Sequence, residues 1–466
     1  MGSDGPDRQA FTDGYDEDRD EHGVPRPGYA QLFDALAGVD LPALTAAVSR
    51  QLDREGVNFG GEPFVVDPVP RLLHATEWDA LARGLAQRAL ALNRFLHDAY
   101  GEQRVVQAGI VAEETIREAE GFEPDLMGRL PAHEAPAAVI GFDVVRAPSG
   151  EFLVLEDNVR TPSGIAYALA ARAAVAETLP RTSLRPRPID PVIYELLGRC
   201  LRAAAPAGSA SPFIVLLTDG PDNVAYFEHA HAAERLGVPL VTPDALIAEG
   251  SQLGVELADG STAAVDVVYR RTDEDRVRDE RGELTEVARR LLPSWLSGNI
   301  GLVNAFGNGI ADDKLVHSHV EEFIGFYLAE EPLVRSVPTQ ALNTAADARD
   351  AIGRLRELVI KPRHGHGGKG VVIGAHAEEA DLQQLAAELV EHPERYVSQP
   401  TVALSRHPTV IDGELAPRHI DLRVFAFCGD EVVLAPGGLS RVALEPDALV
   451  VNSSQQGGGK DTWVID

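Results

Sequence analysis

A chain of 466 residues that is 44% hydrophobic and 24% charged is long enough to bury a large core and to form two or three domains. Its net charge of −30 argues against nucleic-acid or anionic-membrane partners, which are bound by clustered lysine and arginine, and no stretch reaches the about 18 apolar residues of a membrane helix. Only two cysteines occur, Cys200 and Cys428, too few for a disulfide framework, so a cytoplasmic location is expected.

The amino-terminal part of the chain divides into a polar stretch and a helical region. Residues 1–27 are acidic and carry no apolar export signal, so a disordered acidic tail is expected there. Between Leu32 and Tyr100 the apolar residues recur at helical spacing, most clearly over 78–96, which predicts an amphipathic helix packed on a core. We place this helix in a first structured unit, residues 28–189.

The middle of the chain has the pattern of a parallel α/β unit. Residues 212–220 form an apolar run typical of a buried strand, followed by a predicted helix at 224–236 and a second strand at 238–241. We therefore expect an α/β domain over 190–310. The remaining residues, 311–466, contain further predicted strands and a glycine-rich loop near their end, and the overall fold class is mixed α/β (α+β).

A predicted hairpin carries oxygen-bearing side chains near its strand ends. Two apolar runs, 137–146 and 151–158, are separated by a Pro-Ser-Gly turn. Glu156 and Asn158 project from the same face of one strand, and Asp143 lies on its partner, so the three are candidate ligands for two Mg²⁺ ions. The alternative is a group of solvated acidic residues on an exposed strand.

The most specific stretch is a strand, a glycine-rich loop and a second strand, Val359-Ile-Lys-Pro-Arg-His-Gly-His-Gly-Gly-Lys-Gly-Val371. Glycines permit close backbone approach, so successive amide groups are able to line a phosphate site, and a lysine lies on each side. The spacing fits neither a P-loop nor a dinucleotide fingerprint. An ordinary hairpin with a glycine turn is the alternative. The candidate nucleotide ligands are Lys361, Gly365, Gly367, Gly368, Lys369 and Gly370.

Two later features are less specific. Gln399 lies in a strand whose backbone is a candidate hinge for hydrogen bonds to a purine edge. Asp421 and Arg423 project from one face of another strand, because residues two apart point the same way. A surface ion pair explains the second pattern equally well.

The order of these motifs resembles that of the ATP-grasp ligases, with the last part moved to the front. In unpermuted members the lysine strand and glycine loop come first, and the metal hairpin comes last. Here the hairpin comes first, so the chain resembles the circularly permuted ATP-grasp family, bacterial type 2 branch, related to glutathionylspermidine synthase. The resemblance rests on Gly141-Phe-Asp143, Leu155-Glu-Asp-Asn158, Asp67-Pro-Val-Pro-Arg71, Glu156-Asp-Asn-Val-Arg-Thr-Pro-Ser-Gly164, Asn223-Val-Ala-Tyr-Phe-Glu-His229, Asn308-Gly-Ile-Ala-Asp-Asp-Lys314, Asp421-Leu-Arg423, Arg441 and Asn452-Ser-Ser-Gln-Gln-Gly-Gly-Gly459.

The resemblance implies roles for these residues and domains. Lys314 and Lys361 would hold ATP phosphates, the hairpin triad would hold Mg²⁺, and Arg441 would touch the γ-phosphate. The implied domains are an ATP-grasp core hairpin within 28–189, a preATP-grasp-like unit at 190–310, and a nucleotide-binding lobe with a substrate loop at 311–466. One departure is that Gly141 stands where glutathionylspermidine synthase has an arginine, so that enzyme's substrates are not carried over.

The implied reaction joins a small-molecule or peptide carboxylate to an amine through an acyl phosphate, using ATP and Mg²⁺. Positioning and charge neutralisation dominate such phosphoryl transfer. Arg160 and Arg423 are candidates to bind the carboxylate, because guanidinium matches planar anions. Lys460 is expected to supply the charge of a carboxyl-terminal clamp over 452–461, which should lie near the metal hairpin.

Two other functions fit the same motifs. One is a nucleotide-binding partner protein without turnover, and the other is a kinase that stops at a phosphorylated product. The sequence leaves the two substrates, the pathway and the oligomeric state open.

Overall fold

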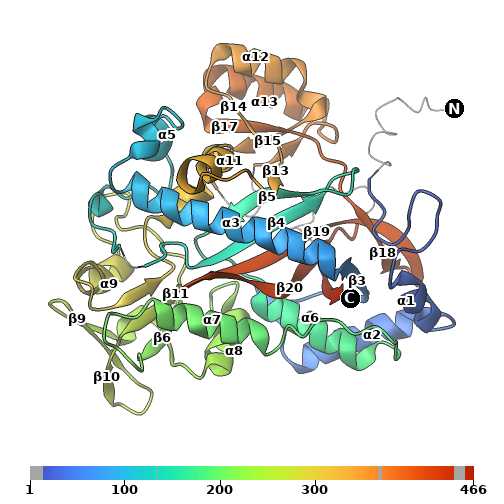
Figure 1. Cartoon of the computed structure of the whole chain (residues 1–466), viewed down its shortest axis with the longest axis horizontal. Helices are drawn as coiled ribbons and strands as arrows, with labels where there is room; N and C mark the ends of the chain where they lie inside the picture. The colour runs from blue at the N-terminus through green and yellow to red at the C-terminus, as the bar shows by residue number, and fades with distance from the viewer. Residues whose placement is uncertain (1–13, 133, 366–369, 446–456) are drawn as a thin grey trace.

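The computed structural model describes residues 14–132, 134–365, 370–445 and 457–466. Three sheets with their helices make up most of it (Figure 1). A large central sheet runs through the middle of the view, a parallel α/β unit lies below it, and a small unit with its own sheet lies at the top. This arrangement confirms the mixed α/β class and the parallel unit that the sequence predicts.

The central sheet has eight strands, ordered β13–β5–β4–β19–β20–β21–β3 with β18 paired to β19. The early hairpin strands β4 and β5 thus share one sheet with strands from the end of the chain, as a permuted fold requires. The final strand, β21, lies between antiparallel β20 and parallel β3. The strands are β3 Val66–His74, β4 Val139–Arg146, β5 Phe152–Asn158, β13 Arg335–Ser336, β18 Arg406–Ile411, β19 Glu414–Cys428, β20 Val432–Val442 and β21 Gly458–Ile465.

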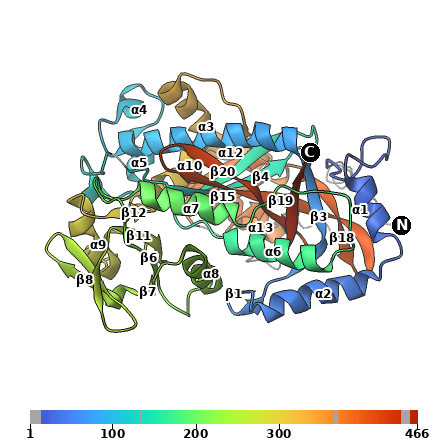
Figure 2. The same cartoon turned by 60° about the horizontal axis from the view of Figure 1, so that its bottom comes forward.

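Helices cover both faces of the central sheet (Figure 2). Helix α3 (Ala75–Ala99) lies on one face, and α6 (Ile165–Thr178) and α7 (Val192–Ala203) lie on the other. The predicted helix over 78–96 is confirmed within α3, which begins with a capping box between His74 and Glu77.

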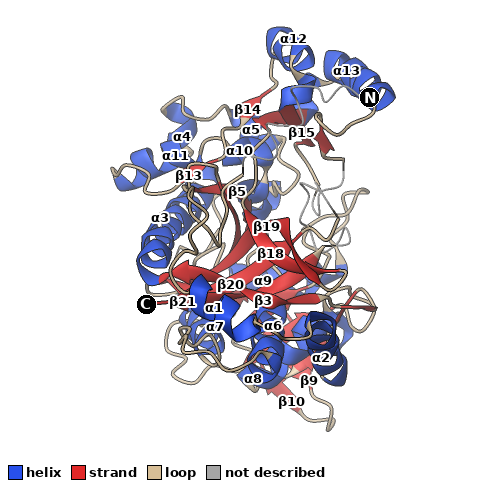
Figure 3. Cartoon of the chain, turned by 90° about the vertical axis from the view of Figure 1, so that its right-hand side faces the viewer, coloured by secondary structure: helices blue, strands red, loops and turns tan. Residues whose placement is uncertain are grey.

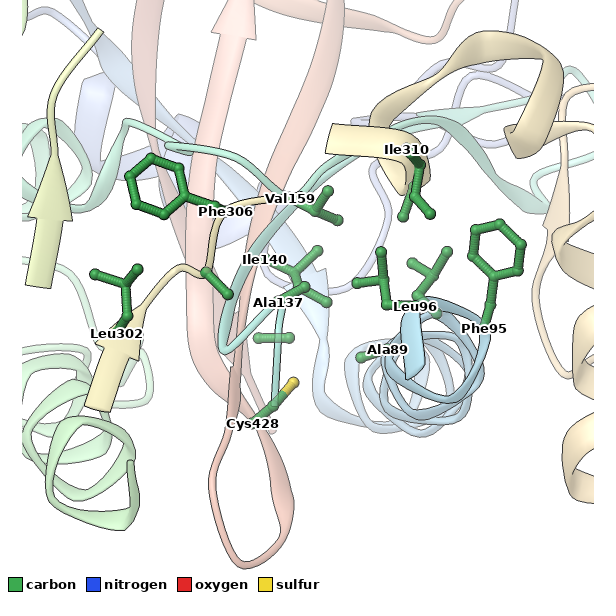
Figure 4. Packing of buried hydrophobic residues seen from close by; sticks show 14 of the residues in the cluster. Ala89, Phe95, Leu96, Ala137, Ile140, Val159, Leu302, Phe306, Ile310 and Cys428 are labelled. Atoms are coloured by element: carbon green, nitrogen blue, oxygen red, sulfur yellow. The ribbon is translucent and has the colours of Figure 1, made fainter. Parts of the chain in front are cut away.

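Two apolar clusters fill the spaces between the central sheet and its helices. Along β19, Val424 and Ala426 belong to the α3 cluster and Phe425 belongs to the opposite one, as the alternation of side chains along a strand requires. Figure 4 shows members of the α3 cluster from α3, the β4–β5 hairpin and residues 302–310. This packing fixes the hairpin that carries the predicted metal ligands.

The predicted α/β unit contains a four-stranded, wholly parallel sheet in the order β12–β11–β6–β7. Its buried strands are short and apolar, as parallel strands covered on both faces are. The elements of this unit are β6 Ile214–Thr218, α8 Tyr226–Leu236, β7 Leu240–Val241, β8 Leu246–Glu249, β9 Gln252–Glu256, β10 Thr262–Ala264, β11 Val267–Arg271, α9 Glu286–Leu296 and β12 Gly301–Val303.

A small unit, residues 340–400, stands apart from the central sheet (Figure 3). Its antiparallel sheet, β14–β17–β15–β16, is covered by two helices and has an apolar core of its own. The expected lobe at 311–466 is therefore divided, because β18, β19, β20 and β21 from its later part join the central sheet. The small unit consists of β14 Gln340–Ala341, α12 Ala345–Gly353, β15 Leu358–Pro362, β16 Val372–Ile373, α13 Glu379–Glu391 and β17 Tyr396–Pro400.

The remaining elements are short or lie at the edges of these units. Among the described residues no single helix is long and apolar enough to cross a membrane. Helices α1 (Tyr29–Leu36) and α2 (Leu41–Arg54) reach that length and hydropathy only when they are taken together, and the chain bends by 100° between them. The remaining helices and strands are α1 Tyr29–Leu36, α2 Leu41–Arg54, β1 Asn58–Phe59, β2 Glu62–Pro63, α4 Arg104–Gln107, α5 Glu113–Arg117, α10 Lys314–His317 and α11 Val320–Phe323.

Residues 14–27 correct the expectation of a disordered tail over 1–27; residues 1–13 lie outside the described part. Glu17 is fully buried, and its carboxylate lies 2.5 Å from Arg71 and 3.4 Å from Arg146. The ring of Tyr15 also stacks against Arg146, with 4.7 Å from the guanidinium carbon to the ring centroid. Acidic composition suggested disorder, but these partners lie far away in the sequence.

Candidate functional site

The predicted metal hairpin has the geometry that its sequence implies. Strands β4 and β5 pair so that Asp143 lies opposite Glu156 and Gly141 lies opposite Asn158. The Glu156 side chain is 31% exposed, and its Oε1 lies 3.4 Å from the ammonium nitrogen of Lys314. The side-chain amide of Asn158 donates to the Gly141 carbonyl at 3.2 Å, which leaves its oxygen as an acceptor. Two hard-oxygen groups therefore share one face of β5.

The two predicted phosphate lysines come together beside Glu156. Lys314 begins α10, and its ammonium group donates to the Gly365 carbonyl at 2.9 Å. Lys361 lies on β15, where burial lowers its pKa to about 8. The negative charge of Glu156 raises this pKa, and the ammonium group of Lys314 lowers it further. Cationic groups from two different units thus meet at the hairpin. Such a cluster is suited to bind a polyanion such as a phosphate chain.

Asp143 is engaged differently from the expectation that it is a metal ligand. Its two carboxylate oxygens accept bonds from Arg423 at 2.7 and 2.8 Å, and Arg441 lies 3.0 Å away. Burial by itself raises the pKa of Asp143, but the two guanidinium groups outweigh burial and hold this pKa well below its ordinary value. Both oxygens are occupied by arginine, because a carboxylate buried between two strands needs compensating charge.

The residues therefore fit Mg²⁺ in part. Glu156 and Asn158 offer the oxygen atoms that Mg²⁺ prefers, and this ion usually takes only one or two protein carboxylates besides phosphates and water. Asp143 offers no oxygen free of arginine. Among the residues that the structure describes, no group of three or more His, Cys, Asp and Glu is arranged to hold a metal.

Arg423, a candidate for the substrate carboxylate, and Arg441, which the resemblance places at the γ-phosphate, belong to one ionic network. Arg441 donates to Asp421 at 2.8 and 2.5 Å, so Asp421 pairs with Arg441, and the alternative of an ion pair between Asp421 and Arg423 is not the arrangement found. Arg423 turns instead toward the hairpin and also reaches the Ser163 carbonyl at 3.1 Å. A Cβ at Gly141 would lie 3.7 Å from the Arg423 side chain and 2.8 Å from the Pro162 Cβ. Pro162 thus leaves little room for a side chain at 141, and Arg423 lies in ordinary contact distance of that position.

Arg160 follows the end of β5 by two residues. It donates to Asp312 at 2.7 Å and lies 3.3 Å from Asp275. Its side chain is 19% exposed. Arg160 therefore retains access to solvent, but its charge is already matched by two carboxylates.

Lys460 does not form the predicted clamp. It is fully buried, and its ammonium group bonds to Asp67 and donates to the Val69 and Pro408 carbonyls at 3.2 and 3.1 Å. The apolar end of β21 anchors this strand inside the sheet, so Lys460 is a buried ion-pair partner. The strand lies in the same sheet as Asp143, but β19 and β20 separate it from β4.

Several predicted residues lie elsewhere or outside the described part. Gln399 is buried, and its side-chain amide donates to the Thr339 hydroxyl at 2.8 Å, while its backbone pairs with β15. Gly365 and Gly370 lie in the loop between β15 and β16. Gly367, Gly368, Lys369 and residues 452–456 lie outside the described residues.

Sequence reasoning missed a second group, which holds the hairpin from behind. Asp157, between the two oxygen donors on β5, points to the opposite face and accepts two 2.6 Å bonds from Arg88. It also bonds to His317 of α10 at 2.7 Å. The alternation along β5 was a signal for the opposite orientation of Asp157. No local pattern indicated its partners Arg88 and His317, which lie 69 and 160 residues away in the sequence.

Asn304 was also missed, and it clamps both strands of the hairpin. Its side-chain amide nitrogen donates to the Val139 and Val159 carbonyls at 2.6 and 2.7 Å, and its oxygen accepts from the Val139 amide at 2.8 Å. Asn308 donates to the same Val159 carbonyl at 2.5 Å. These bonds satisfy buried backbone groups at the start of β4 and directly after β5. The hairpin ends are therefore fixed by the α/β unit.

Comparison with known proteins agrees with this geometry. Residues 70–443 match the model of the family described as circularly permuted ATP-grasp type 2. A Frankia alni protein named putative glutamate–cysteine ligase is 41% identical over 97% of this chain, which spans only 54% of that relative. An uncharacterized Mycobacterium tuberculosis protein is 39% identical over 97% of this chain and 84% of its own length.

Two further comparisons cover nearly the whole chain. A Synechocystis protein is 39% identical over 97% of both chains. A solved glutathione synthetase-like effector from Globodera pallida, in its apo form, has a similar fold: the TM-score is 0.58 at 12% identity, over 91% of this chain and 96% of that one. From the family match, the full-length relatives and the permuted sheet order, we conclude that the chain belongs to the circularly permuted ATP-grasp type 2 family.

Proposed function

We propose that this protein is an ATP- and Mg²⁺-dependent ligase that joins a carboxylate to an amine, with ADP and phosphate as products. Family membership and the ligase name of one relative support ATP-dependent ligation in general terms. The observation that carries the finer proposal is the approach of Lys361, from the small unit, to Lys314 and Glu156 of the body, which gathers two ammonium groups and a carboxylate in one place.

In this proposal the cationic residues bind the phosphate chain, and the oxygen-bearing residues bind the metal ion. Lys314 and Lys361 would neutralise the phosphate oxygens of ATP, and Glu156 and Asn158 would hold Mg²⁺, which supplies further neutralisation when it is bound. Arg423 and Arg441 lie beside this place, tied to Asp143. Their guanidinium groups are rigid, so they are suited to stabilise charge without reorganising during the reaction.

The proposed reaction has two steps. A substrate carboxylate oxygen attacks the γ-phosphorus, the bond from this phosphorus to the bridging β–γ oxygen breaks, and ADP leaves with that oxygen. The amine nitrogen then attacks the acyl carbon, the carbon–oxygen bond to phosphate breaks, and phosphate leaves while the nitrogen loses a proton. The protein forms no covalent bond in this scheme, and positioning and electrostatics supply the acceleration.

The substrates are proposed only as classes, a small-molecule or peptide carboxylate and an amine. The glutamate–cysteine ligase name belongs to a relative that is nearly twice the length of the aligned region. Because that name refers to two amino acids, amino-acid substrates are the first to test. The strongly negative charge of the chain disfavours nucleic acid as a partner.

The test is an ADP-release screen of carboxylate and amine pairs, with mass spectrometry of the products. The proposal expects ADP release that requires Mg²⁺, a carboxylate and an amine together, and a product lighter by one water than the two substrates combined. ADP release that needs a carboxylate but is indifferent to every amine would instead indicate a kinase. Nucleotide binding without turnover across the screen would indicate a partner protein.

A further inference from the structure

We propose that the ion pair between Arg363 and Asp313 is a latch that holds the small unit against the body of the protein, so that Lys361 and Lys314 address the same phosphate chain. This inference rests on the proposed function, because it explains how two lysines from separate units reach one nucleotide. Neither partner of the pair touches the predicted metal ligands.

Arg363 leaves the small unit and is buried in the body. It follows Lys361 by two residues at the end of β15, and its backbone amide donates within the small unit to the Arg395 carbonyl at 2.7 Å. Its guanidinium group donates to both oxygens of Asp313 at 3.1 and 2.9 Å, to the Thr115 carbonyl in α5, and to Glu118 at 3.5 Å. The side chain is only 4% exposed. One arginine therefore bridges two units in a dry environment.

The Asp313 carboxylate makes two kinds of contact: it pairs with Arg363 of the small unit, and it caps α10 of the body. It is the N-cap of α10, and its Oδ1 accepts from the amides of Leu315 and Val316 at 2.8 and 3.3 Å. The next residue is Lys314, whose ammonium group faces Glu156. The carboxylate that receives the small unit thus also sets the helical turn that presents a phosphate lysine.

The small unit has an apolar core of its own. Its apolar core, formed around Ile360, Leu382 and Leu389, shares no residue with the clusters of the central sheet. Polar contacts at the loop add to the latch, chiefly from Lys314 and from Glu120, which accepts from the Gly365 amide at 3.3 Å. Units with separate cores move relative to each other unless specific contacts oppose the motion.

The decisive variant is Asp313→Asn. Asparagine is a good N-cap, so α10 keeps its cap while Arg363 loses its nearer, buried carboxylate partner and retains Glu118, which lies 3.5 Å away and is 61% exposed. Calorimetry with a nonhydrolysable ATP analogue and Mg²⁺ should show affinity about tenfold weaker, since a charge-assisted buried bond is replaced by a neutral one. Arg363→Met should cause a similar loss, and the double variant should be no worse than the weaker single one. Arg363→Lys should recover part of the affinity.

The matched control is Arg356→Met, which removes an arginine that pairs at 2.9 Å with Glu379 inside the small unit and is half exposed. It should bind the analogue as the wild type does. With an active substrate pair, the latch variants should raise KM for ATP and leave KM for the carboxylate unchanged, whereas a general loss of structure would raise both.

The outcomes separate this inference from the proposed function. Wild-type protein that binds no nucleotide would overturn the proposed function, and the latch with it. Normal wild-type binding with unchanged affinity in Asp313→Asn and Arg363→Met would overturn the latch alone. If Asp313→Asn fails to fold, Arg363→Met decides, because it leaves the cap of α10 intact.

Discussion

Replacing Arg88 by methionine should destabilise the protein by about 3–5 kcal/mol at pH 7, because it leaves a buried carboxylate without its main counter-charge. Arg88 is fully buried, and its two bonds to Asp157 are both 2.6 Å. Asp157 would keep only His317 as a partner. The control is Arg117→Met: Arg117 pairs with Glu113 at the same 2.6 Å but is 62% exposed. Its loss should cost less than about 1 kcal/mol.

The assay is unfolding in denaturant at pH 7 and pH 4. Burial raises the pKa of Asp157, but Arg88 outweighs burial and holds this pKa far below its ordinary value in the wild type. Asp157 therefore stabilises the wild type above its unfolded pKa of about 4, and this contribution fades as the pH falls toward the folded pKa. In Arg88→Met the carboxyl group should protonate readily, so the gap between the two proteins should narrow at pH 4. A gap under 1 kcal/mol at pH 7, or one that stays the same at pH 4, would refute this reasoning.

Three other predictions concern turnover and folding. Glu156→Gln, and separately Asn158→Ala, should abolish Mg²⁺-dependent ADP release with an unchanged circular dichroism spectrum, because a cation ligand is lost without loss of apolar burial; near-normal turnover in both would remove the metal assignment. Lys361→Ala should weaken ATP binding strongly. Wild-type affinity for ATP should fall as the pH rises through about 8, where Lys361 loses its charge, and Lys361→Arg should lack this fall. Calorimetry from pH 6.5 to 9 checks both expectations. Deleting everything after Val451 should prevent folding rather than only turnover, since β21 is an internal strand; a soluble, cooperatively unfolding truncated protein would contradict this.

The sequence predicted those parts of the site that depend on local pattern. Alternation along one strand placed Glu156 and Asn158 on a common face, and the glycine-rich stretch lay between two strands with Lys361 at its start. The helical spacing of residues 78–96 likewise predicted α3. Each of these signals spans fewer than about 20 residues, which is the range over which periodicity is informative.

What the sequence missed depends on contacts between distant segments. Nothing near Lys460 indicated that Asp67 would neutralise it, so a charged residue among glycines suggested a solvent-facing clamp. Glu17 stood in an acidic stretch, and its burial depends on two arginines more than 50 residues away. For Asp143, the sequence suggested metal binding, but two arginines from the end of the chain take its oxygens.

The place of β21 between β20 and β3 also has a consequence for synthesis in the cell. Strand β3 must wait for its neighbour until residues 458–465 have left the ribosome, almost the whole described chain later. At usual translation speeds this delay is roughly 20 to 80 s, during which β3 lacks its partner strand in the central sheet. An unpaired edge invites pairing with other chains, so the nascent protein should depend on chaperones that shield residues 66–74. Ribosome-bound chains of increasing length, probed by proteolysis, should stay sensitive in the central sheet until β21 emerges.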